Sequence, residues 1–533
     1  MSISFHPYPM DIPERLNMAD WAIDRWVRQG HGDRVAFVAP HPAGGGDAIL
    51  ELTYAAMQER MNRAGNAMRA LGVGRGERVL VRSQNTPEIL AIVLGCLKIG
   101  AVPMAVSSLF RSEELAYILR NSEAAVAVSS QELAGPLRAI RQRVPTLKTL
   151  ATLGGSEAGE TALEPLLAAS SAELACADTR RDEAAFVFYT SGTSGNPKGI
   201  CQAHRYVIGA LDPLARFLVQ FQPHERMYNP HEISFSYAFG WTFFMPLLVG
   251  ASSILHLGRI EPRSLLQNIQ RFRPQILASV PTLYNAMMAL DDRQAYDMRS
   301  LRLIISAGAP LHQELHAEMR AYFGCEVREA IGQSESQTFI GQWGDRPRKP
   351  GSLGYPLPSY HIRILDEEGK DCPPGAIGSI AIRDDHPSLF IAYQGLPQFW
   401  QANHRDGWYH TGDMGHLDGE GCIWFDARGD DLIKSRGYLV SPDEIERVLA
   451  GHPAVAEVGV IGVPDAYYGR RLRAYVALRP GAAAGEEELK QHVRERLAPF
   501  KTPQEVVFLP AMPRTATGKL QRVTLRRLME TQG

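Results

Sequence analysis

The chain has 533 residues, with 56 Lys and Arg against 58 Asp and Glu, which gives a formal net charge of −2. That length exceeds what one compact core holds, so we expect two or more domains and a large enzyme. The balanced charge offers neither a basic surface for nucleic acid nor an acidic tail, which argues against nucleic-acid binding.

The cysteines and the apolar segments indicate where the protein works. Six cysteines are scattered without a CxxC pair or metal-ligand spacing, which fits a reducing, cytoplasmic setting. The amino terminus has no charged region followed by an apolar stretch, so we expect no secretory signal. The most apolar stretch, Ile89 to Val106, carries Lys98 and is interrupted by Gly95, Gly100 and Pro103. It predicts a buried helix and a core strand rather than a membrane span.

Amphipathic helical stretches alternate with short β-rich runs through most of the chain. In chain order, the expected elements are a helix at 54–71, a strand at 78–81, a helix at 87–97, a strand at 101–106, a strand at 184–188, a strand at 301–306 and a helix at 311–323. This alternation predicts an α/β architecture with largely parallel sheets.

A smaller unit begins near Asp430. Glycine-rich hairpin signals start at Gly407, and the pattern then restarts with a helix at 441–449, strands near Val458 and Ala474, a surface turn at 480–485 and a helix at 486–497. We therefore predict a large N-terminal domain of layered α/β sheets, residues 1–429, and a small C-terminal α+β domain, residues 430–533.

The segment from Tyr189 to Gly199, YTSGTSGNPKG, directly follows an expected apolar strand. Glycines let a loop turn its N–H groups toward an anion, and hydroxyls and Lys198 add donors and charge, which suits a polyphosphate. An ordinary Ser/Gly turn is the alternative, but the lysine and the preceding strand favour a phosphate-binding loop. It is not a Walker A loop, because Pro197 and Gly199 stand where that motif needs glycine and a hydroxyl.

This loop resembles the YTSGTTGxPKG motif of the adenylate-forming superfamily, which includes acyl-CoA synthetases, adenylation domains and luciferases. Ser194 replaces the second threonine, and further family motifs recur in order from about Leu52 almost to the carboxyl terminus. The resemblance implies ATP, Mg²⁺ and coenzyme A as cofactors and a small carboxylic acid as substrate. It also implies that the small C-terminal domain is mobile and joined by a hinge.

The resemblance implies nucleotide-binding roles in two segments. In the loop, the expected phosphate-binding residues are Ser191, Gly192, Thr193, Ser194, Gly195 and Lys198, with Thr190 acting in catalysis. The segment Ile331-Gly332-Gln333-Ser334-Glu335 resembles YGxTE. It implies that Glu335 is a catalytic residue and a Mg²⁺ ligand, which fits the need of a phosphate-bridging cation for a carboxylate. It also implies that Gly332 and Ser334 contact the adenylate and that Ile331 contacts the acid.

Two further segments resemble motifs that act on the ribose and at the hinge. Tyr409-His410-Thr411-Gly412-Asp413 resembles YxTGD, which implies that Asp413 accepts hydrogen bonds from the ribose hydroxyls. The run from Arg428 to Lys434 resembles GRxDDxxK, although Ala427 stands where the family usually has glycine. Arg428 would hold ribose and phosphate, and Asp430 would be the pivot.

Near the carboxyl terminus, Pro513 to Lys519 resembles PxTxTGK. The resemblance implies that Lys519 reaches the carboxylate and the α-phosphate during adenylation, where a fixed ammonium stabilises developing negative charge. In the second half-reaction the small domain would rotate, withdraw this lysine and present Gly437 to the pantetheine thiol.

The strand expected at 301–306 runs into Ala307-Gly308-Ala309-Pro310. This loop lies at the carboxyl end of a strand, where α/β folds place ligands. We therefore expect Gly308 and Ala309 to contact the nucleotide and Ala307 to contact the acid.

The aromatic run from Phe235 to Trp241 gives information about which carboxylic acid the protein binds. Such runs are often only core, but this one resembles FxAYGxG of benzoate-CoA ligases, which implies an acid pocket formed by Phe235, Tyr237, Ala238 and Gly240. Amino-acid-activating relatives carry an aspartate where Tyr237 stands, so a free α-amino acid is disfavoured. The stretch Val280 to Tyr284, VPTLY, supports the family more than the substrate.

Three functions compete at this stage. The first is an aryl-CoA ligase, the second is an enzyme that loads an aryl or fatty acid onto a separate carrier protein, and the third is a catalytically idle homologue. Lys198, Glu335, Asp413 and Lys519 argue against the third. No fused carrier domain follows Lys519, so we expect free coenzyme A as acceptor. The sequence leaves open the ring substituents and whether the chain forms a homodimer.

Overall fold

The computed structural model describes residues 3, 5–41, 48–190, 197–309, 311, 313–435, 438–465, 469–497, 499–514 and 520–532. The chain divides into two compact units. The larger unit comprises 5–361 and 383–407, and the smaller unit comprises 1–4, 362–382 and 408–533. This division differs from the domain boundary expected at Asp430, since the smaller unit includes 362–382 and 408–429, and the two domains 1–429 and 430–533 stay a prediction.

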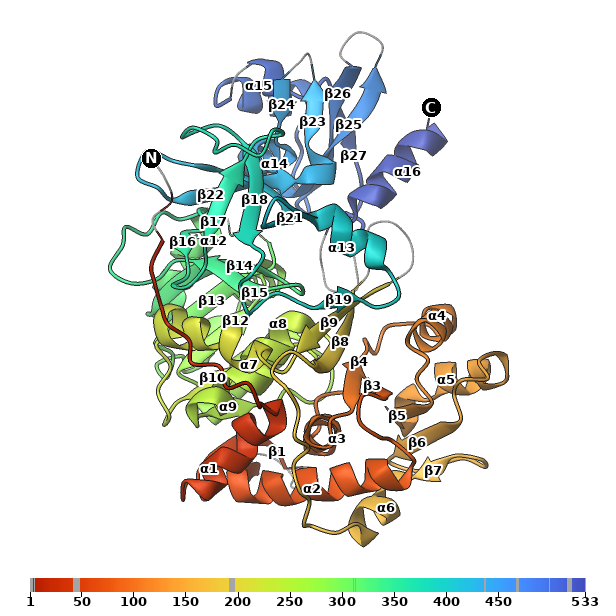
Figure 1. Ribbon diagram of the computed structural model, residues 1–533. Helices are drawn as coiled ribbons and strands as arrows, with labels where there is room; N and C mark the ends of the chain where they lie inside the picture. The colour runs from red at the N-terminus through yellow and green to blue at the C-terminus, as the bar shows by residue number, and fades with distance from the viewer. Residues whose placement is uncertain are drawn as a thin grey trace. The chain divides into compact units, whose positions relative to one another are not determined.

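Strands of the larger unit form a nine-stranded sheet in the order β16-β15-β14-β13-β12-β10-β11-β1-β2 within the described residues (Figure 1). Their bounds are β1 Val35–Pro40, β2 Ile49–Thr53, β10 Arg226–Tyr228, β11 Ser252–Ile254, β12 Ile276–Ser279, β13 Leu303–Ala307, β14 Glu326–Gln333, β15 Gln337–Gly341 and β16 Tyr355–Pro356. The strands from β1 to β14 in this order pair in parallel, and β2, β15 and β16 pair antiparallel at the edges.

Two other sheets complete the strand pairing described within the larger unit. One is parallel throughout, with β4 Val102–Ala105, β3 Arg78–Arg82, β5 Val126–Ser130, β6 Thr149–Leu153 and β7 Thr161–Ala162 in that order. The other is antiparallel, with β19 Ala392–Tyr393, β9 Lys198–Ala203 and β8 Ala184–Thr190. The expectation of largely parallel sheets therefore holds for the first two sheets, and it fails where hairpins join neighbouring strands.

Helices of the larger unit cover these sheets. They are α1 Arg25–Arg28, α2 Tyr54–Ala70, α3 Pro87–Lys98, α4 Ser112–Ser122, α5 Gly135–Ile140, α6 Leu163–Ala169, α7 Tyr206–Gly209, α8 Ser236–Ala238, α9 Met245–Val249, α10 Pro262–Phe272, α11 Pro281–Met288, α12 Gln313–Phe323 and α13 Pro397–Asn403. The π-helical turns are η1 Asp20–Asp24, η4 Leu214–Val219 and η5 Phe239–Phe244, and the 3₁₀ turns are η2 Gln131–Leu133, η3 Arg141–Arg143 and η6 Arg293–Ala295.

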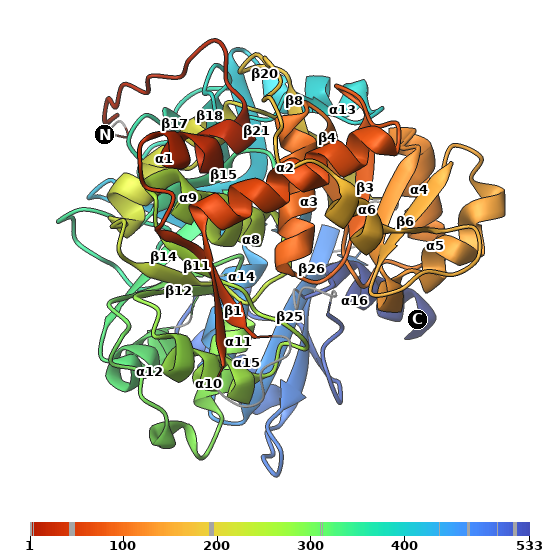
Figure 2. The same cartoon turned by 90° about the horizontal axis from the view of Figure 1, so that it is seen from below.

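The apolar stretch at 89–106 forms the buried helix and strand that the sequence predicts. Helix α3 begins where the Thr86 hydroxyl accepts the Ile89 N–H and Pro87 occupies the first turn. It packs along α2 (Figure 2), and a Cβ on Gly95 would lie 2.5 Å from the Gly65 nitrogen, so only glycine allows this close crossing. Among the described residues, the helices are too short or too polar to span a bilayer.

The smaller unit contains an antiparallel sheet and an α+β portion. The strands of the antiparallel sheet are β17 Ile362–Leu365, β18 Gly378–Arg383, β21 Trp408–Leu417 and β22 Ile423–Arg428, and β20 His404–Arg405 precedes β21 in the chain. The remaining elements are η7 Gly429–Asp431, β23 Ile433–Ser435, β24 Tyr438–Val440, α14 Pro442–Ala450, β25 Val455–Asp465, β26 Gly469–Leu478, α15 Glu486–Arg494, η8 Pro499–Lys501, β27 Glu505–Phe508 and α16 Arg522–Gln532.

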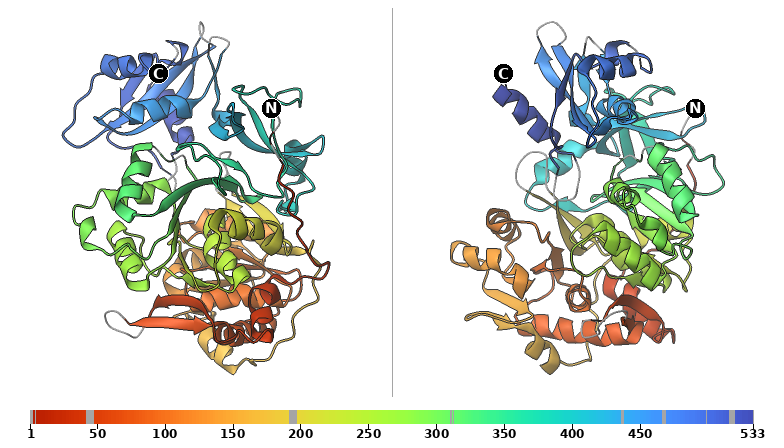
Figure 3. Two further views of the ribbon diagram at one scale, coloured as in Figure 1. Left: turned by 90° about the vertical axis from the view of Figure 1, so that its left-hand side faces the viewer. Right: turned by 180° about the vertical axis from the view of Figure 1, so that it is seen from behind.

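Alternation along β25 and β26 gives this α+β portion two apolar faces. Val460 packs with Ile445 and Leu489 of α14 and α15, whereas the next residue, Ile461, packs with Leu525 of α16. Figure 3 shows α16 alongside β25. The helices and strands expected between 441 and 497 are confirmed, and α16 is an element that we did not predict.

Candidate functional site

The predicted phosphate loop connects the two strands of a hairpin. Thr190 at the end of β8 pairs with Lys198 at the start of β9, and Tyr189 pairs with Gly199. The Lys198 ammonium lies 3.8 Å from the ring centroid of Phe399 in α13. Five predicted phosphate-binding residues, namely Ser191, Gly192, Thr193, Ser194 and Gly195, lie outside the described residues. A strand follows the loop, so the described residues here offer no helix N-terminus to bind an anion. Binding of a phosphate would instead depend on the loop N–H groups, the hydroxyls and Lys198.

Glu335 is held next to this hairpin. Its Oε1 accepts a hydrogen bond from the Tyr393 hydroxyl at 3.0 Å, and Tyr393 pairs with Ile200 of β9. The Gln202 side-chain amide, also on β9, donates to the backbone carbonyls of Ser334 at 2.8 Å and Glu335 at 3.2 Å. The Tyr393 hydroxyl therefore orients the Glu335 carboxyl group, and carboxylate oxygens are the ligands that Mg²⁺ prefers.

Hydrogen bonds join the aromatic helix α8 to the same segment. The Ser334 hydroxyl lies 2.8 Å from the Ser236 hydroxyl, and the Gln337 side-chain amide donates to the Ser236 carbonyl at 3.0 Å. A Cβ on Gly240 would lie 2.3 Å from Gln337 Nε2, and one on Gly332 would lie 2.6 Å from the Gln337 carbonyl oxygen. Both predicted glycines therefore leave room for Gln337, a buried residue that the sequence motifs do not identify.

Tyr237 is buried, and its ring packs edge-on against Trp241 at 5.3 Å and Phe235 at 6.3 Å between centroids. Its hydroxyl has no hydrogen-bond partner among the residues that the structure describes. Burial raises the pKa of Tyr237 and keeps the phenol neutral. A buried donor without a partner is costly, so this hydroxyl favours a polar group on a ligand. Ala238, which follows, is fully buried.

The carboxyl ends of two neighbouring parallel strands, β13 and β14, carry the other predicted acid and nucleotide contacts. Ala307 ends β13 beside Ala330 of β14, which precedes Ile331. Gly308 has φ of +87°, a conformation that favours glycine, and it turns the chain away from the sheet before the exposed Ala309.

His231 lies at the same edge of the sheet and was not predicted. Its Nε2 is 3.3 Å from the hydroxyl of Ser279, the last residue of β12. Burial lowers the pKa of His231 to about 4, so the imidazole is neutral at pH 7. A neutral imidazole offers one donor and one acceptor at this end of the sheet.

In the smaller unit, Asp413 and Arg428 face each other across β21 and β22. The Arg428 guanidinium donates to Asp413 Oδ1 at 2.6 Å, and the two residues are register partners. The Thr411 hydroxyl accepts the Asp413 N–H at 3.1 Å and donates to the Ile380 carbonyl at 2.8 Å. Asp413 is therefore a buried, fixed acceptor with a cation beside it, as the predicted ribose contact requires.

The hinge and the mobile catalytic groups are described only in part. The Asp430 backbone lies in the 3₁₀ turn η7, between β22 and the β23–β24 hairpin. Gly437 and Lys519 lie outside the described residues. The roles assigned to these three residues stay predictions.

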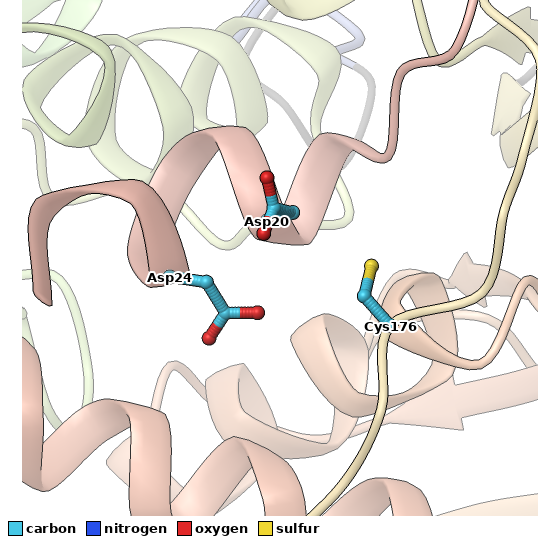
Figure 4. A group of neighbouring side chains, drawn as sticks. All are labelled: Asp20, Asp24 and Cys176. Atoms are coloured by element: carbon cyan, nitrogen blue, oxygen red, sulfur yellow. The ribbon is translucent and has the colours of Figure 1, made fainter. Parts of the chain in front are cut away.

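A separate cluster of Asp20, Asp24 and Cys176 brings possible metal ligands within 4.8 Å of one another (Figure 4). Lys98 lies 2.7 Å from the Asp24 carboxylate, and Arg28 pairs with both oxygens of Asp20. Burial and the nearby carboxylates raise the pKa of the Cys176 thiol to about 12. The two cations balance the two carboxylates, so this cluster is a structural ion-pair network.

Comparisons with known proteins identify the family. Residues 23–393 match the model of the AMP-binding enzyme family, and residues 444–519 match that of the AMP-binding enzyme C-terminal domain. The chain is 34% identical to benzoate–CoA ligase of Thauera aromatica, over 99% of each chain. It is 32% identical to 3-hydroxybenzoate–CoA/4-hydroxybenzoate–CoA ligase of the same organism, over 97% of this chain and 98% of the relative.

A solved structure shows the same architecture. The anthranilate CoA ligase AuaEII, in complex with anthranoyl-AMP, superposes with a TM-score of 0.90 at 30% identity and covers 98% of each chain. The predicted fold, a large α/β domain followed by a small C-terminal domain, is thereby confirmed, as is the resemblance on which it rests. The chain belongs to the family of AMP-binding enzymes.

Proposed function

We propose that the chain is an ATP-dependent acid–CoA ligase that activates a benzoate-like acid as its acyl-adenylate and then forms the acyl-CoA thioester. The observation that carries this proposal is the pair of contacts from Ser236 to Ser334 and Gln337, which fixes the aromatic helix α8 against the segment that ends in Glu335. These contacts support a connection between the proposed acid pocket and the segment that carries the proposed metal ligand, Glu335. The named aryl-CoA ligases among the relatives support the same chemistry.

The reaction needs two displacements. In the first, a carboxylate oxygen attacks the α-phosphorus of ATP and pyrophosphate leaves; in the second, the thiolate of coenzyme A attacks the acyl carbon and AMP leaves. We assign Thr190 and Lys198 to the phosphates and Asp413 with Arg428 to the ribose. Lys519 stabilises the charge that builds on the transferring oxygens. Mg²⁺, when bound at Glu335, neutralises phosphate charge.

The metal assignment can be tested with Glu335→Gln, which keeps an oxygen acceptor for Tyr393 but removes the charge. We expect the Mg²⁺ concentration for half-maximal pyrophosphate release to rise by about tenfold or more, with little change in KM for the acid. Glu314→Gln, at an exposed position in α12, is the control. Unchanged metal dependence in Glu335→Gln would place the cation on another carboxylate.

The acid pocket can be tested at Tyr237. Because an aromatic pair contributes roughly 0.5–1.5 kcal/mol, Tyr237→Ala should raise KM for benzoate-like acids roughly two- to tenfold. KM for ATP should not change. Tyr237→Phe keeps the ring and removes the unpartnered hydroxyl, so it should weaken only acids with a hydrogen-bonding ring substituent. Wild-type preference for linear fatty acids over every cyclic acid would contradict the aryl assignment.

The acceptor is assigned to coenzyme A, and a separate carrier protein is the alternative. Offering the enzyme acid, ATP and either coenzyme A or a phosphopantetheinylated carrier separates them, because only the true acceptor forms a thioester. The proposal also includes a cytoplasmic location and the absence of a nucleic-acid partner. It includes motion of residues 430–533 relative to 1–429. It further includes a homodimer, which light scattering would test.

A further inference from the structure

Two arginines of the C-terminal helix hold the carboxylate that follows the hinge residue. Arg526 Nη2 lies 2.6 Å from Asp431 Oδ1, and Arg522 Nη1 lies 3.5 Å from Asp431 Oδ2. Asp431 is the last residue of the turn η7 and directly follows Asp430. The chain thus has a charged attachment between this turn and α16, although 91 and 95 residues separate the partners in sequence.

Arg522 also binds two carboxylates of α14. Its Nη2 lies 2.6 Å from Asp443 Oδ1 and 2.7 Å from Glu446 Oε2. Glu446 Oε1 in turn accepts the Val460 N–H of β25 at 2.7 Å. One guanidinium therefore connects the turn η7, α14 and, through Glu446, the strand β25.

Most of the side chains in this network are shielded from solvent, although Arg526 is 32% exposed. Arg522 is 17% exposed, and its three carboxylate partners are 12–16% exposed. Burial and the neighbouring Asp443 raise the pKa of Glu446 to about 7. Two guanidinium groups thus hold three carboxylates, and removal of either arginine leaves buried negative charge uncompensated. A buried ion network often adds little to the free energy of unfolding, but it can hold the attached elements in one arrangement. A positioning role therefore fits this network.

The network joins residues that are close in sequence to the two groups predicted to move. Arg522 begins α16 only three residues after Lys519, and Asp431 follows the pivot Asp430. We propose that Arg522 and Arg526 are positioning residues that fasten Asp431 to α16, so that rotation is confined to the backbone at Asp430 and Lys519 moves with the hinge turn. This inference rests on the proposed two-step function, but the network itself belongs to the smaller unit alone.

The test is a double-mutant cycle with Asp431→Asn and Arg526→Gln. Because misplacement of a catalytic group is expensive even when its cause is remote, each single variant should lower kcat for adenylation by about tenfold. KM for ATP and for the acid should stay near wild type. The double variant should be no slower than either single one, because the two residues act through one contact. Arg527→Gln, at the next and exposed position of α16, is the control.

Three results would overturn the inference: wild-type kcat in both single variants, losses that multiply in the double variant, or losses that only follow a lower melting temperature. Arg526→Lys keeps the charge and should retain most of kcat, so an equal loss in this variant would also contradict it. If the proposed function itself is wrong, wild-type enzyme will release no pyrophosphate with any acid, which distinguishes that failure from failure of the network.

Discussion

Lys519→Ala should lower pyrophosphate release from ATP and acid by about 10²-fold or more, because one fixed charge stabilises the oxygens around the α-phosphorus as the carboxylate attacks. The same variant should convert a supplied acyl-adenylate and coenzyme A into thioester at nearly the wild-type rate. The second half-reaction breaks a bond at the acyl carbon, and in the proposed domain alternation the small domain would by then have rotated and withdrawn this lysine.

The control for this experiment is Lys370→Ala, which removes an exposed lysine from the smaller unit. It should leave both half-reactions unchanged. Equal loss of both half-reactions in Lys519→Ala would contradict domain alternation, because the lysine would then serve a single arrangement of the enzyme.

Asp430→Pro should allow one half-reaction and block the other. Proline fixes φ near −65°, so the backbone at 430 could no longer take two conformations. Asp430 lies in the short turn η7. The residue after it, Asp431, is bound to Arg526 of α16, so little other backbone in this turn is free to rotate. We expect pyrophosphate release or thioester formation from supplied adenylate to persist, but not both.

Asp430→Ala provides the matched control, since alanine leaves φ free and should support both half-reactions. Rates of both half-reactions are measured separately in each variant. Wild-type rates for both in Asp430→Pro would place the hinge at another residue.

Most of the fold followed from the sequence because its signals are local. The apolar stretch that begins at Ile89 predicts α3 and the strand after it, and the alternation of amphipathic helical stretches with short β-rich runs predicts the parallel sheets. The antiparallel sheets were less visible, since a two-residue strand such as β19 is too short for a pattern and pairs with β9, which lies far away in the sequence. Helix α16 was not predicted.

The motif residues of the site were predictable, but the residues that hold them were not. Glu335 stands in a recognisable segment, whereas Tyr393, which orients its carboxylate, comes from a two-residue strand 58 positions later. Gln337 and the Asp431–Arg526 pair likewise depend on contacts between distant parts of the chain. Such contacts carry no periodicity or local composition, so only the folded structure reveals them.

The central claim is that the carboxylate attacks the α-phosphorus of ATP. Benzoate labelled with ¹⁸O in its carboxylate tests it directly when it is converted in the presence of ATP and coenzyme A. The bridging oxygen of an acyl-adenylate comes from the acid and leaves with AMP, so the AMP should gain one labelled oxygen and pyrophosphate should gain none. Label in inorganic phosphate, with ADP as the other product, would show attack at the γ-phosphorus and would contradict the adenylate mechanism.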